Sequence, residues 1–186
     1  MGDAPLILTH RFDATSFARF DAERRQHFPP ARNHIPAHLT LFHHLPGDRH
    51  GEIAAELVAL AAVQTPFPLA VSSLRFLAHG TAYAIESPEL GRLRAGLATR
   101  WSAHLTRQDA QGFRPHVTIQ NKVAATAARV LFAALSAPFI PFEAQATGLL
   151  LWHYRGGPWE AAGEASAADP SFLAGAWRTA ETMPLS

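Results

Sequence analysis

His38-Leu39-Thr40-Leu41-Phe42, residues 38–42, lies within an apolar run from residue 37 to residue 45 that ends at the turn-forming sequence Pro46-Gly47-Asp48. A short apolar run of this kind, bounded by a turn, predicts a β-strand. Side chains on a strand alternate between its two faces. We therefore expect His38, Thr40 and Phe42 to share one face, while the two leucines between them pack into a core.

A second stretch, Arg114-Pro115-His116-Val117-Thr118-Ile119, repeats this pattern later in the chain. The run from residue 113 to residue 123 predicts another strand, in which His116 and Thr118 again share a face. A single His-x-Thr sequence means little in a chain with 11 histidines. Two copies, each closely preceded by proline and each opening a strand that leads to a helix, indicate a common role. We call His38-Leu39-Thr40 the first motif and His116-Val117-Thr118 the second motif.

The elements predicted after the two motifs follow the same order: a helix, a Pro-Phe break and a hairpin. The helices are expected at 52–64 and 124–136, the breaks at 66–67 and 138–139, and the hairpins at 69–86 and 147–164. Few residues align between the halves, so the order of elements and the paired motifs carry the prediction of an internal duplication.

Two further helices are predicted from their caps. Asp13 is a good N-cap for a helix that runs to about His27 and buries Phe17 and Phe20. Ser87 followed by Pro88 opens another helix in the favoured way, with proline at the first helical position. A short strand over residues 5–10 precedes both.

Composition limits the class of protein. The 186 residues are 48% hydrophobic and 17% charged, which is enough to bury a core without disulfides or metals. The lack of cysteine excludes disulfides, thiolate zinc sites and thiol nucleophiles, and it favours the cytoplasm. A net charge of +1 is unlike that of proteins that hold long nucleic acids by charge alone. No signal peptide and no apolar span are present, so we expect a soluble protein that does not bind membranes. No obligate protein partner is evident, so we expect a monomer.

The residues of the two motifs suit phosphoryl chemistry if both strands face one cleft. Cleavage of a phosphodiester needs a base for the attacking oxygen and an acid for the leaving oxygen, and histidine serves as either near neutral pH. Threonine hydroxyls donate hydrogen bonds to the non-bridging phosphate oxygens. This scheme needs no metal and no other cofactor.

On these residues the chain resembles the 2H phosphoesterases, and within them the bacterial 2′-5′ RNA ligase-like branch. The resemblance covers roughly residues 5–164. It implies an α+β, bilobal, duplicated fold in which two antiparallel sheets line a central cleft and the helices lie outside.

The resemblance also implies an activity: opening of 2′,3′-cyclic phosphates, or cleavage or ligation of 2′-5′ linkages, as in RNA processing. By the same likeness His38 and His116 are the general acid and base, and Thr40 and Thr118 anchor the phosphate. Which histidine is the acid stays open, because the roles exchange with the direction of the reaction.

The chain departs from the family at one position. Many relatives carry an arginine five residues after the second histidine, where this chain has Asn121. Arg114, Lys122 and Arg155 are candidates to replace that positive charge. Tyr154, beside Arg155, is the preferred residue for stacking on a base. The other aromatic candidates are Phe42, Phe76, Tyr83 and Trp152, whereas Trp101 and Trp159 are interpreted as structural.

We expect one domain over residues 1–164 and a loosely packed or mobile tail over 165–186. A zinc site built from His34, His38, His43 and His44 is disfavoured, because Pro36 prevents the helix that would align the first two. Two alternatives remain open beside the RNA or nucleotide phosphoesterase. One is a phosphodiesterase for another small cyclic or dinucleotide-like metabolite, and the other is a non-catalytic module that binds RNA or nucleotides.

Overall fold

The structure is a computed structural model that describes residues 3–166. In chain order, its strands and helices are β1 (Leu6–Phe12), α1 (Ala14–His27), β2 (Leu39–Leu45), α2 (His50–Ala61), β3 (Phe67–Phe76), β4 (Thr81–Glu86), α3 (Pro88–Arg100), β5 (His116–Gln120), α4 (Ala125–Ser136), β6 (Phe142–Tyr154) and β7 (Trp159–Ser166). The last strand ends two residues beyond the expected domain boundary, and Ala165 and Ser166 are buried. The rest of the expected tail lies outside the described residues.

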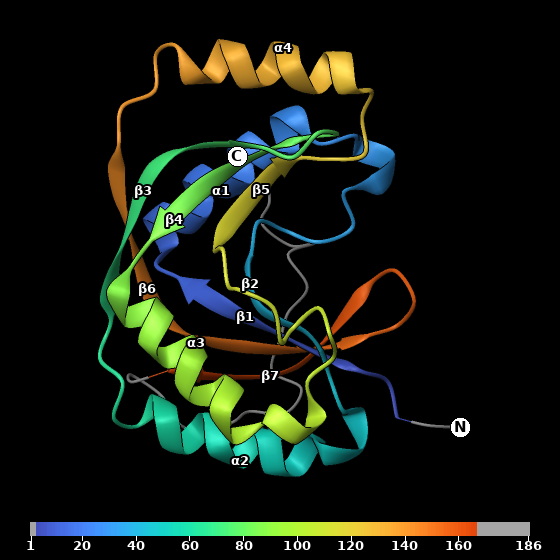
Figure 1. Ribbon diagram of the computed structural model, residues 1–186, viewed down its shortest axis with the longest axis vertical. Coiled ribbons are helices and arrows are strands. Elements are labelled where there is room, and N and C mark those ends of the chain that lie inside the picture. Colours follow the sequence, from blue (N-terminus) through green and yellow to red (C-terminus); the bar gives the residue numbers. More distant parts are fainter. Residues whose placement is uncertain (1–2, 167–186) are drawn as a thin grey trace, which may run out of the picture.

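The strands form one antiparallel sheet with the order β2-β1-β6-β3-β4-β5, and β7 pairs with β6. The expected α+β fold with antiparallel strands and outer helices is thus confirmed, but the two expected sheets are hydrogen-bonded into one. The long strand β6 joins them, because residues 142–146 pair with β3 and residues 146–153 pair with β1. The sheet curves, so its edge strands β2 and β5 contact each other, as Figure 1 shows.

The helices cover the ends of this curved sheet (Figure 1). Helix α4 packs on β3 and β4, α1 packs on β5, and α2 packs on β6 and β7. Helix α3 lies beside α2 and buries Leu90, Leu93 and Leu97. Among the described residues, no helix has the length and apolar character needed to cross a bilayer.

Both predicted N-caps are present. Oδ1 of Asp13 accepts hydrogen bonds from the backbone N–H groups of Thr15 and Ser16, and Oγ of Ser87 accepts one from Leu90. Phe20 is fully buried as expected, but the prediction for Phe17 is wrong, since 37% of its surface is exposed. The buried face of α1 is largely polar, because Asp21 and Arg24 hydrogen-bond the backbone of neighbouring segments.

The order β-α-β-α-β occurs twice, first from β1 to β3 and then from β4 to β6. Exchanging these halves leaves the strand order of the sheet unchanged, since β2-β1-β6 on one side corresponds to β5-β4-β3 on the other. This symmetry is compatible with the predicted duplication, and it puts the two motif strands at equivalent edges.

Candidate active site

The two motifs occupy matching places in the sheet. Thr40 on β2 pairs with Thr9 on β1, and Thr118 on β5 pairs with Ala82 on β4. In each motif the histidine and threonine are half-buried and the residue between them is fully buried. His38 lies one residue before the start of β2 rather than within it. Each edge strand thus presents one imidazole and one hydroxyl on the same face.

The two imidazoles are held by the same hydrogen bond. Nδ1 of His38 lies 2.8 Å from the carbonyl oxygen of Pro36, and Nδ1 of His116 lies 2.9 Å from that of Arg114. Because a carbonyl oxygen only accepts, Nδ1 must carry the proton in both rings. In the neutral rings this leaves Nε2 of each histidine free to take up a proton.

Both imidazoles have lowered pKa values. Burial is the main cause for His38, and the charges of Arg24, His116 and His43 add to it, so that its pKa falls to about 4 although the bond to Pro36 opposes the change. Burial also lowers the pKa of His116, with further contributions from the charges of Arg75 and His43. Both rings are therefore neutral at pH 7, and the charge of one affects the other.

The strand register slips by one residue directly after each motif threonine. Pairing passes from Thr9–Thr40 to Leu8–Phe42 in one half, and from Ala82–Thr118 to Thr81–Gln120 in the other. Such bulges turn a strand and re-aim its side chains. The prediction that Phe42 shares the face of His38 and Thr40 is therefore wrong. Phe42 is fully buried against Trp101, at a ring distance of 5.2 Å. This position also rules Phe42 out as a base-stacking residue.

A buried arginine from the opposite half binds each motif strand at its bulge. Nη1 of Arg24 on α1 donates to the carbonyl of Thr118 at 2.8 Å, and Nε of Arg94 on α3 donates to the carbonyl of Leu41 at 2.7 Å. Arg24 also donates from Nε to Asn33 and to the carbonyl of Ile35, in the loop that leads into the first motif. Each half of the chain thus holds the motif strand of the other half.

Two tryptophans that lie far from the first motif in sequence adjoin it in space. The ring of Trp159 is 4.8 Å from that of His38, and the ring of Trp152 is 6.1 Å from that of Trp159. Nε1 of Trp152 donates to Oγ1 of Thr9, the partner of Thr40. The interpretation of Trp159 as merely structural missed this contact. The sequence could have indicated this contact, because Trp159 directly follows the turn of the last predicted hairpin. This position puts Trp159 opposite Tyr154, the preferred stacking residue.

Arg75 on β3 adjoins the second motif, and sequence reasoning missed it because no motif surrounds it. Nη1 of Arg75 donates at 3.3 Å to the carbonyl of Arg114, the group that also accepts from His116. The guanidinium is therefore next to the second imidazole.

The four predicted substrate-binding residues differ in their position relative to the motifs and in their exposure. Arg114 precedes His116 and has an exposed side chain. Lys122 follows β5 at its other end, exposed and with a positive φ of 61°. Arg155 is bound to Glu160 across the last hairpin at 2.6 Å. Tyr154, with 39% of its surface exposed, lies opposite Trp159.

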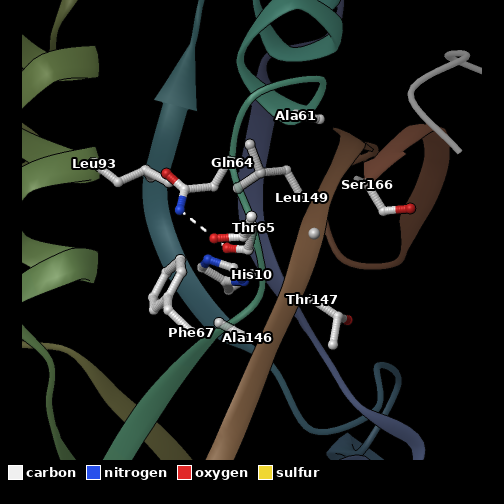
Figure 2. Close-up of a pocket in the computed structure, with 11 residues that line it drawn as sticks. His10, Ala61, Gln64, Thr65, Phe67, Leu93, Ala146, Thr147, Leu149 and Ser166 are labelled. Atoms are coloured by element: carbon white, nitrogen blue, oxygen red, sulfur yellow. Dashed lines mark hydrogen bonds between the residues drawn. The ribbon is translucent and has the colours of Figure 1, made fainter. Parts of the chain in front are cut away.

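The pocket in Figure 2 is separate from the motifs. It is lined by His10, Phe67, Gln64 and residues of β6, among others, and no motif residue takes part. His10 follows Thr9 on β1, so its side chain lies on the opposite face of the sheet from the pair Thr9–Thr40. As for metals, no three His, Cys, Asp or Glu side chains within residues 3–166 come together as ligands.

Comparisons with known proteins bear on the family and the fold. The model of the 2′-5′ RNA ligase superfamily matches residues 12–158. TT0787 of Thermus thermophilus superposes with a TM-score of 0.62 at 18% identity, covering 89% of this chain and 98% of that one. LigT of E. coli, in its complex with 3′-AMP, gives a TM-score of 0.57 at 15% identity, covering 88% and 97%. None of the curated protein sequences matches the chain. At these identities the structural likeness shows the fold.

Proposed function

This chain belongs to the 2′-5′ RNA ligase superfamily, and from that premise we propose that it is a phosphoesterase for nucleotide or RNA phosphodiesters with His38 and His116 as its acid–base pair. One observation carries the proposal: both imidazoles donate from Nδ1 to the carbonyl two residues earlier. These bonds give both rings the same tautomer and leave Nε2 of each ring for proton transfer, which is what an acid–base pair at one phosphate can use.

The reaction we propose is the opening of a 2′,3′-cyclic phosphate, with cleavage or ligation of 2′-5′ linkages as related reactions. Nε2 of one neutral imidazole takes a proton from water while the water oxygen bonds to phosphorus. The bond from phosphorus to one ribose oxygen breaks, and the other imidazole, protonated, gives its proton to that oxygen. Thr40 and Thr118 donate hydrogen bonds to the non-bridging oxygens, where negative charge accumulates.

The side chains around the motifs suit a nucleotide. LigT of E. coli has been crystallised with 3′-AMP and with ATP. We propose that Trp159 and Tyr154, which pair on the last hairpin, stack on the base. Arg75 lies next to His116 and is better placed to meet the phosphate than Lys122. Arg114 and Arg155 remain candidates at the rim, although Glu160 already neutralises Arg155.

We propose that the chain acts as a monomeric, single-domain cytoplasmic enzyme on RNA or nucleotide substrates, with no resident metal. The lack of cysteine supports the choice of compartment. The family match over residues 12–158 and the burial of Ala165 and Ser166 support one catalytic unit that includes β7.

The test is hydrolysis of 2′,3′-cyclic mononucleotides in excess EDTA by the intact protein and by His38→Ala, His116→Ala and the control His34→Ala, in which an exposed histidine is removed. Turnover that survives chelation and is lost in the two motif variants alone supports the proposal, and the phosphate isomer formed identifies the leaving oxygen. Undiminished turnover in either motif variant contradicts it. Binding of 3′-AMP without turnover of any phosphodiester favours the non-catalytic module, and turnover of other cyclic or dinucleotide-like compounds alone favours the metabolite enzyme.

A further inference from the structure

A buried carboxylate holds a third histidine near the two motifs. Asp109 lies between α3 and β5, and 1% of its side chain is exposed. Its carboxylate accepts hydrogen bonds from the backbone N–H groups of His43 and His44, at 2.8 and 2.9 Å, and from Nδ1 of His43 at 3.1 Å. Asp109 therefore fixes the backbone and the ring of His43 together.

The backbone of β2 turns His43 toward the motif face. Pairing with β1 passes from Leu8–Phe42 to Leu6–Leu45, so the two residues between Phe42 and Leu45 both lie opposite Ile7. Residues opposite each other in a pair share a face, and Ile7 shares the face of Thr9, the partner of Thr40. In agreement, the charge of His43 lowers the pKa values of both His38 and His116. His43 thus lies on the face that carries both motifs, and 47% of its side chain is exposed.

The carboxylate behind the ring is ionised. Burial alone would raise the pKa of Asp109, but the hydrogen bonds from the His43 side chain and from the two backbone N–H groups, with the charge of His43, outweigh burial and lower it. Because Nδ1–H of His43 is directed at this carboxylate, Nε2 is the ring nitrogen that remains to bind a ligand. A negative charge behind the ring compensates the positive charge that the ring carries when it donates to an anion from Nε2.

We propose that His43, oriented by Asp109, is a third imidazole of the active site and donates from Nε2 to the substrate's phosphate group. It would then supply the charged donor for which many relatives use an arginine at the position of Asn121. The inference rests on the proposed function, because the phosphate is that of the substrate. Lys122 follows the far end of β5 from His116 and Arg155 is bound to Glu160, so neither fills this role as directly.

The test compares His43→Asn with the matched control His44→Asn. Asparagine places its amide nitrogen near the position of Nδ1, so it keeps a donor for Asp109 while removing Nε2. The dissociation constant of inorganic phosphate and the kinetics on a 2′,3′-cyclic nucleotide are measured, with thermal melting as a check on folding. We expect His43→Asn to raise the phosphate dissociation constant and KM about tenfold or more, the size expected for one hydrogen bond to a charged group. The value of kcat should change less, and His43→Gln, whose amide reaches nearer to Nε2, should recover part of the affinity.

His44 lies in the same bulge, but Asp109 meets only its backbone N–H and orients only the ring of His43, so His44→Asn should match the intact protein. Unchanged phosphate binding in folded His43→Asn overturns the inference, as does an intact protein that binds no phosphate. An equal loss of phosphate affinity in His44→Asn also overturns the inference, since the loss would then result from a change in the bulge of β2 and not from the ring of His43. Phosphate binding needs no turnover, so a failure of the proposed reaction and a failure of the role of His43 are told apart.

Discussion

At the scale of single residues, the phosphate-binding role that we propose for the motif hydroxyls can be separated from their packing. Thr40→Val and Thr118→Val keep the branched shape that packs on the strand and remove only the O–H donor. We expect each to lower kcat roughly 10²-fold, as loss of one donor to a developing oxyanion does, with little change in thermal stability. The conservative variants Thr40→Ser and Thr118→Ser should retain most of the activity. Valine variants with full kcat would show that the hydroxyls do not touch the reacting phosphate.

The lowered pKa values of the two motif histidines predict an acidic optimum. The proposed reaction needs one neutral and one protonated imidazole, and the ratio kcat/KM reports the free enzyme. Because both pKa values lie below the usual 6.5, both rings lose their protons before pH 7. We expect a bell-shaped dependence of kcat/KM on pH with its maximum below about pH 6.5, in which the two limbs belong to the coupled pair.

Arg75→Gln provides the check on this profile. It removes a positive charge that lowers the pKa of His116, so the limb that reflects this group should move to higher pH. Exposed Arg32, in the turn before the first motif, is the control, and Arg32→Gln should leave the profile in place. A maximum above pH 7 in the intact protein contradicts the proton assignment.

At the scale of helices and strands, the cross-binding of the motif strands predicts a cost in stability. Lysine at position 24 keeps the charge of Arg24 but does not reach Thr118, Asn33 and Ile35 at once. We expect Arg24→Lys to lower the free energy of unfolding by roughly 2 kcal/mol in urea titration and to reduce kcat, because β5 is less firmly placed. Arg94→Lys should do the same through β2. Arg32→Lys, at an exposed site, should stay within about 0.5 kcal/mol. Equal stability of Arg24→Lys and Arg32→Lys would show that the hydrogen bonds of Arg24 do not contribute to the free energy of unfolding.

Much at this scale follows from sequence, and the exceptions have a physical reason. The strands at the two motifs and the N-caps Asp13 and Ser87 are evident from apolar runs and capping residues, and the α+β class is implied by the resemblance to the 2H phosphoesterases. The bulges after Thr40 and Thr118 are not, because a slip of one residue is set by the partner strand and leaves no mark in the hydrophobic pattern. The bulge of β2 is the reason why the predicted face of Phe42 is wrong. Likewise, Arg24 and Arg94 lie on helices where a charged residue is ordinarily solvated.

At the scale of the whole molecule, the halves exchange strands. Strand β3 belongs to the first half yet pairs with β4 of the second, while β6 belongs to the second half yet pairs with β1 of the first. Sequence predicts two similar halves with one motif each. It predicts the pairing of β3 with β4, as the hairpin at 69–86, but not the pairing of β6 with β1, because apolar strands far apart in the sequence do not identify their partners. The exchange turns two expected sheets into one and brings the motif strands together.

This exchange predicts that neither half folds alone. A chain cut after Ala78, in the turn between β3 and β4, gives a first fragment in which β1 lacks β6 and β3 lacks both neighbours, and a second fragment in which β4 and β6 lack β3. Unpaired strands and their exposed apolar faces cannot offset the entropy of ordering them. We expect each fragment alone to show no cooperative thermal transition by circular dichroism, and an equimolar mixture to recover one together with phosphoesterase activity. Activity should need both fragments, since His38 and His116 lie on different ones. Cooperative unfolding of an isolated fragment would mean that the halves are independent lobes, in which case the pairing of β6 with β1 and β3 would contribute little to stability.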